Sequence, residues 1–249
     1  MRFVGQQPAQ PSTPAASPPV QVRVPGWLGQ AMIVLRKDLA IELKTGEVVT
    51  TSGFFSLLVV ITTSLSFYGG PTQQRLVAAG VIWLALAFAA VLALGRSWQR
   101  ERDEGALDGL LAAPLARSAI YFGKTLGLLL FLLVVWLVVL PVAAILFSLD
   151  IADVGPGLLL IALAATPGIA ASGTLFGAMT VRTRARDLML AIVLFPLLSP
   201  TLLAAVVATR ELIGGAPLGE LVDYLKLMCM FDAVFLSGGL AMFGGLIEH

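Results

Sequence analysis

A mixed-charge segment between two long apolar stretches holds the residues best suited to a specific interaction. Charged residues crowd positions 96–104, and they are followed by an apolar group in which Leu107, Leu110 and Leu111 stand three and four residues apart. At this spacing a short helix presents an apolar face beside an acidic face. Pro114 ends it, because the residue before a proline is pushed out of the helical conformation. Three leucines presented together favour a surface that binds a partner over a solvated connector without one.

Other residue types that carry chemistry are too isolated to form a catalytic or metal site. Cys229 and His249 are each the only one of their kind, which excludes a disulfide framework and a Cys/His zinc site. The methionines stand where filling gaps between helices is their commoner role, so we expect no directly bound cofactor, haem included. The run Gly-Lys-Thr at 123–125 resembles the end of a phosphate loop, but Ser118 stands where that loop needs its first glycine. We therefore expect a partner to bind any nucleotide.

The composition places these segments in a membrane protein. Of the 249 residues, 58% are hydrophobic and 12% are charged, whereas a soluble domain has roughly 25% charged residues. The net charge of +1 also excludes the basic surface with which proteins bind nucleic acids. A polytopic membrane protein is the class that remains.

Six apolar windows are long enough to cross a bilayer, for which a helix needs about 20 residues. Spans of this length must be helical, because hydrocarbon offers the backbone no hydrogen-bond partners. The predicted fold class is therefore an all-α membrane protein with six transmembrane helices. These lie near 51–68, 77–95, 125–148, 157–180, 188–208 and 228–247.

The basic residues predict the orientation, because cytoplasmic loops retain Lys and Arg. If the N-terminus is cytoplasmic, only Arg75, Arg210 and Lys226 lie on the outer side, which leaves 13 of the 16 basic residues inside. We therefore expect both termini in the cytoplasm.

The region before the first span divides into two parts. Residues 1–26 are rich in Pro, Gln, Ala and Ser, and we expect them to be disordered. Over 27–45 apolar residues recur at helical spacing, with Lys37 and Lys44 expected on the far side. The apolar set is Leu28, Met32, Leu35, Leu39 and Leu43. This pattern predicts an amphipathic helix at the membrane interface, before Gly46 turns the chain into the bilayer; packing on a partner protein is the alternative.

Four blocks of sequence resemble the CcmB family, the permease subunits of ABC transporters for cytochrome c maturation. They are the run from Glu101 to Lys124, Gly80-Val-Ile-Trp83, Val181-Arg-Thr-Arg-Ala-Arg186 and Phe195-Pro-Leu-Leu-Ser-Pro200. The resemblance covers roughly residues 30–249, so 27–249 is taken as the permease domain. The acidic-Gly-x-Leu-x-x-Leu-Leu-x-x-Pro pattern is shared by many type-2 ABC exporters, and the combination of blocks is more specific.

The resemblance implies a non-catalytic permease of type-2 ABC exporter architecture in the bacterial inner membrane, coupled to a separate ATPase subunit. The segment after the second span would be the coupling helix that contacts the ATPase. Its residues are Glu101, Asp103, Glu104, Gly105, Leu107, Leu110, Leu111 and Pro114. The other implied partners are a haem-handling membrane subunit, a small single-span subunit and a periplasmic haem chaperone. The complex would handle haem, by export or by release of the loaded chaperone.

Three further features of the sequence each allow more than one interpretation. Arg182, Arg184 and Arg186 form a second ATPase contact or an anionic-lipid contact, or they only anchor the topology. Asp232, an ionisable residue inside the sixth span and expected near its outer end, has a structural or subunit-interface role, with proton relay as the weaker alternative. Glycines of that span suit packing within the chain or a homodimer seam.

Two alternative functions remain beside cytochrome c maturation. A type-2 ABC permease for another substrate, such as a drug or a lipid, shares the coupling pattern. An intramembrane enzyme is opposed by the lack of paired membrane carboxylates and of a Ser/His or Cys/His dyad.

Overall fold

The computed structural model describes residues 25–67, 70–103, 109, 112–180 and 186–247, and these form helices joined by short connections. The helices are α1 (Trp27–Thr45), α2 (Glu47–Ser66), α3 (Gly70–Asp103), α5 (Arg117–Leu146), α6 (Ile151–Thr180), α7 (Arg186–Ile213), the 3₁₀ turn η1 (Leu218–Leu221) and α8 (Val222–Ile247). Six segments of the described chain are long and apolar enough to cross a membrane. The predicted number of spans is therefore confirmed.

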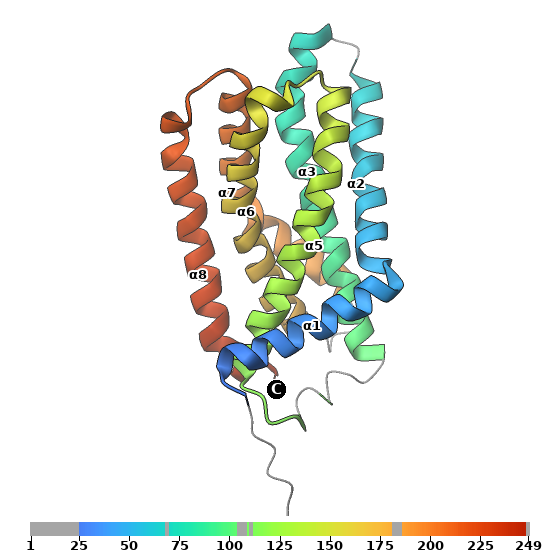
Figure 1. The fold of residues 1–249 in the computed structure, drawn as a ribbon, viewed down its shortest axis with the longest axis vertical. Helices are drawn as coiled ribbons and strands as arrows, with labels where there is room; N and C mark the ends of the chain where they lie inside the picture. The colour runs from blue at the N-terminus through green and yellow to red at the C-terminus, as the bar shows by residue number, and fades with distance from the viewer. Residues whose placement is uncertain (1–24, 68–69, 104–108, 110–111, 181–185, 248–249) are drawn as a thin grey trace, which may run out of the picture.

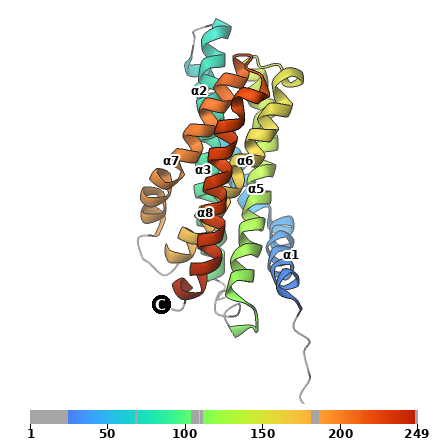
Figure 2. The same ribbon diagram turned by 90° about the vertical axis from the view of Figure 1, so that its left-hand side faces the viewer.

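The six long helices run side by side along the long axis of the molecule, and α1 lies across one end of the bundle (Figure 1). Helix α1 packs on α5, and α6 packs against α5, α7 and α8. The first and last described residues lie at the same end as α1 (Figures 1 and 2), as an even number of spans requires.

The spans are longer than the sequence windows predicted, at both ends of the bundle. Helix α3 continues from the predicted limit at residue 95 to Asp103, and α5 begins at Arg117 in place of residue 125. At these two limits the predicted windows stopped beside charged residues, Arg96 and Lys124. Charged residues do not end these helices, because several of them are paired with charges on neighbouring helices.

Alanine fills much of the interior and lets the helices approach closely. On α3, Ala85, Ala89 and Ala93 are buried at one-turn spacing, and on α6 Ala162 and Ala165 are buried. A buried hydrogen bond also joins two helices, because Nε1 of Trp83 on α3 donates to Oγ1 of Thr209 on α7 at 2.8 Å. Apolar side chains on the outer surfaces of the spans are exposed, as a lipid environment allows.

Candidate functional site

Four charged side chains meet where α1 crosses the ends of α3 and α5. Oε1 of Glu101 accepts a hydrogen bond from Nζ of Lys124 at 2.8 Å and another from Nζ of Lys37. Asp38 lies beside both lysines, with its carboxylate 3.2 Å from Nζ of Lys37 and 3.4 Å from Nζ of Lys124. We call these four residues the Glu101 cluster; they come from three helices.

The centre of the Glu101 cluster is removed from solvent. Glu101 and Lys124 are each 5% exposed. Nζ of Lys124 also lies 5.0 Å from the centroid of the buried Trp98 ring, within reach of a cation–π interaction. A buried charge is tolerated only when it is paired and hydrogen-bonded, so the four side chains hold one another in place.

Lys37 stays charged in this setting. Burial by itself lowers the pKa of its ammonium group, but the nearby Asp38 carboxylate and the hydrogen bond to Glu101 outweigh burial and raise that pKa above its usual 10.5. The ammonium group of Lys37 is therefore positively charged at neutral pH.

The connection from α1 to α2 is tied to α3 by further charges. Arg100 of α3 donates to Glu47 at 3.2 Å and lies 3.9 Å from Glu42, and Arg96 donates to Glu47 at 3.1 Å. Glu42 also accepts a hydrogen bond from the backbone N–H of Val49 at 2.8 Å, in the first turn of α2. It satisfies a donor that the start of a helix leaves without a partner.

Gly46 makes the turn between these two helices, as the sequence predicts. Its φ of +60° lies in the left-handed region, which glycine adopts without the cost that a Cβ imposes. Its N–H donates to the carbonyl of Glu42 and closes α1.

Helix α1 lies directly on the start of α5. A Cβ at Gly123 would lie 2.5 Å from the carbonyl oxygen of Ala31, so the crossing has no room for a side chain there. Nε1 of Trp27 donates to Oγ of Ser118 at 2.9 Å, and Oε1 of Gln30 accepts from the backbone N–H before α5 at 2.7 Å. The Gly-Lys-Thr run that resembles a phosphate loop thus forms part of the surface on which α1 is packed.

The apolar face predicted for α1 is divided between two environments. Leu28, Met32 and Leu43 are exposed, at 68%, 44% and 87%, whereas Leu35 is buried against the bundle. The prediction that Lys37 lies on the far side is wrong, since this side chain is half-buried and faces Glu101. Its placement follows from the charges of α3 and α5, which an analysis of α1 alone does not include.

The structure places one predicted coupling residue, Glu101, at the centre of the Glu101 cluster. Asp103 is the last residue of α3, and Pro114 is exposed before α5. Glu104, Gly105, Leu107, Leu110 and Leu111 lie outside the described residues, as do Arg182 and Arg184; Arg186 is the first residue of α7. Contact of these residues with an ATPase stays a prediction.

Asp232 lies elsewhere, between α8 and α6. It is the eleventh of the 26 residues of α8, so the expected position near the outer end of the span is wrong. The side chain is 9% exposed, and its Oδ1 lies against Gly168 of α6, where a Cβ would collide with it. The error arose because α8 begins at Val222, before the apolar window does. Its packing against α6 fits the structural role that the sequence favoured.

Lys37, Asp38 and Lys124 were not predicted as site residues. The signal for them in the sequence was that acidic and basic residues stand close to the ends of apolar segments. From the sequence alone, both lysines indicate the membrane orientation, and Lys37 also marks the polar side expected of the 27–45 helix.

Known proteins resemble this chain over most of its length. A model of the family described as CcmB protein matches residues 30–243. Proteins named heme exporter protein B are similar to it. That of Paracoccus denitrificans is 30% identical over 201 residues, which is 76% of this chain and 87% of the relative. That of Haemophilus influenzae is 27% identical over 82% of this chain and 91% of the relative, and that of Bradyrhizobium diazoefficiens is 28% identical over 73% and 82%.

Proposed function

We propose, from the premise that this chain belongs to the CcmB family, that it is the membrane permease subunit of an ATP-driven haem exporter for cytochrome c maturation. The names of the similar proteins support haem as the substrate of the complex. Six membrane-spanning helices support a multi-pass protein of the bacterial inner membrane, and the basic residues favour cytoplasmic termini. The ATPase activity belongs to a separate subunit.

The observation that carries the mechanism is the junction of three helices at Glu101. This residue is two positions before the end of α3, and α3 leads into the segment that carries Leu107 and Leu110. A force on that segment reaches α3, and through the Glu101 cluster it reaches α1 and α5 together. Charged pairs with fixed geometry let these helices move as one body, as hinge and shear motions require.

The remaining partners follow from the family. We propose a haem-handling membrane subunit, a small single-span subunit and a periplasmic haem chaperone around this chain and its ATPase. This chain supplies motion and binds no haem itself. The Arg182, Arg184 and Arg186 group is a second contact with the ATPase or with anionic lipid.

Substitution of the predicted apolar contact tests the coupling. Leu110→Asp places a charge where the ATPase is proposed to bind an apolar surface, so the ATPase should no longer co-purify with the chain or be stimulated by it. The matched control is Leu218→Asp. Leu218 is an exposed residue of η1, at the end of the bundle opposite α1. Both variants should insert into membranes in normal amounts. Wild-type binding and stimulation with Leu110→Asp would show that the assignment is wrong.

A further inference from the structure

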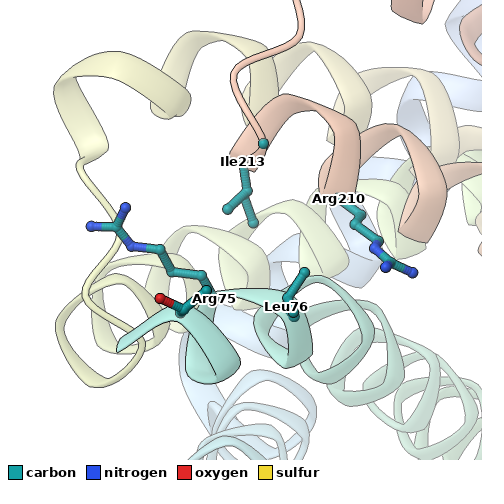
Figure 3. Close-up of a pocket in the computed structure, with 6 residues that line it drawn as sticks. Arg75, Leu76, Arg210 and Ile213 are labelled. Carbon is teal, nitrogen blue, oxygen red and sulfur yellow. The ribbon is translucent and has the colours of Figure 1, made fainter. Parts of the chain in front are cut away.

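A pocket with two arginines lies at the end of the bundle opposite α1. It has a volume of about 340 Å³ and is lined by Thr72, Arg75 and Leu76 of α3 and by Arg210, Ile213 and Gly214 at the end of α7. Leu76 and Ile213 point toward each other, and the two arginine side chains lie on either side of them (Figure 3). The pocket therefore combines an apolar centre with a positively charged rim.

Neither Arg75 nor Arg210 forms an ion pair with an acidic residue in the described part of the chain. Arg75 donates from Nε to the carbonyl oxygen of Ser148 at 3.1 Å, which leaves its two terminal amino groups available. Arg210 makes no hydrogen bond or ion pair with any residue that the structure describes. Its guanidinium group points away from Leu76 and Ile213 (Figure 3), so this side chain must turn inward to hold an anion in the pocket. Lys226 at the same end is paired with Asp223 at 3.1 Å. Acidic residues are thus present at this end, but none that the structure describes forms an ion pair with either arginine.

The distribution of charge makes this pairing of arginines unusual for the chain. Of the basic residues that the structure describes, Arg75, Arg210 and Lys226 lie at the end opposite α1, and two of these three line one pocket. Residues that only fix topology would be expected at the other end.

The two helices that form the pocket are also hydrogen-bonded to each other. Trp83 of α3 donates to Thr209 of α7, the residue before Arg210.

We propose that this pocket binds the phosphodiester headgroup of an anionic phospholipid from the adjoining leaflet. Guanidinium groups bind phosphate oxygens through paired, charge-assisted hydrogen bonds. Leu76, which is 53% exposed, and Ile213 would contact the first carbons of the acyl chains. The volume lies near the lower limit of ligand pockets, about 300–1,000 Å³, which suits a headgroup. The site does not depend on which substrate the transporter carries.

The experiment compares lipids retained by the full-length chain. The protein is reconstituted in nanodiscs of phosphatidylcholine with a minor fraction of phosphatidylglycerol, released into mild detergent and analysed by native mass spectrometry. Wild type should retain phosphatidylglycerol in preference to phosphatidylcholine. Arg210→Gln should reduce that preference about tenfold, the loss expected when a charge-assisted contact is removed. Arg210 forms no hydrogen bond or ion pair within the described part of the chain, so this variant should fold.

The control variant is Lys226→Gln, which removes a positive charge at the same end but outside the pocket and should retain the wild-type preference. Equal loss in both variants would reduce the effect to general surface charge and overturn the site. An unchanged preference in Arg210→Gln would do the same. Two competitors separate the sources of the anion: displacement of the lipid by millimolar inorganic phosphate, or by haem through its carboxylates, would also overturn the proposal. Retention of the lipid against both supports it.

Discussion

At the scale of single residues, the charges of the Glu101 cluster have a structural role that limits what Glu101 can do. One carboxylate oxygen accepts from two lysines, and the side chain is 5% exposed. Its contribution to a partner contact would therefore act through the position of α3, which it fixes against α1 and α5. The sequence resemblance pointed to Glu101, and the residues that bind it are separated from it in sequence by 23 and 64 positions.

Removal of one member of the buried pair should destabilise the chain, because the other member keeps an uncompensated charge. We expect Lys124→Met to lower the free energy of unfolding by about 3 kcal/mol. The double variant with Glu101→Gln should lose less than the sum of the two single losses, since the partners interact. Thermal unfolding in detergent measures both. Lys226→Met, which breaks an exposed pair, should change stability little; strictly additive losses for the buried pair would contradict the cluster.

The pH dependence of Lys37 provides a second check. Its pKa in the folded protein is raised above the usual 10.5 of the unfolded chain. Its contribution to stability is therefore complete at pH values below 10.5 and is lost as the pH rises through the raised pKa. The difference in melting temperature between wild type and Lys37→Met should be constant near neutral pH and shrink in strongly alkaline buffer. A difference that instead shrinks on mild acidification from neutral pH would show that another group controls it.

At the scale of elements, the sequence predicted the helices well and their environment less well. The six apolar windows and the turn at Gly46 were read correctly, because hydropathy over about 20 residues and a glycine between two helices are local signals. The helix ends and the position of Lys37 depend on charges from other helices. The depth of Asp232 was misjudged because the apolar window starts at residue 228. Helix α8 starts at Val222, which places Asp232 farther from the helix end.

The packing of α1 on α5 depends on the absence of a side chain at Gly123. Gly123→Ala should force the two helices apart, because the new Cβ would lie 2.5 Å from a backbone oxygen and 2.8 Å from Cβ of Val34. We expect a loss of about 1–3 kcal/mol in stability and faster hydrogen exchange in α1. Gly80→Ala is the matched control, since no atom beyond its chain neighbours and the nearby backbone of its own helix lies within 4 Å of a Cβ there. Similar results for the two variants would show that the crossing is looser than described.

At the scale of the whole molecule, the two ends of the bundle differ in their charges. At the end with α1, acidic and basic side chains pair with one another across helices and join α1, α3 and α5. At the other end two arginines line a pocket without anionic partners in the described chain. This division suits a subunit that receives force at one end and contacts lipid at the other.

The most direct test of the proposed function is the amount of covalently bound haem in membranes of a strain that lacks this gene. We predict that c-type cytochromes are lost and that the wild-type gene restores them. The gene with Leu110→Asp should fail to restore them although the protein reaches the membrane in normal amounts. Accumulation of haem-loaded chaperone in the deletion strain would place the defect at the release step. Intact c-type cytochromes in the deletion strain would contradict the proposed function.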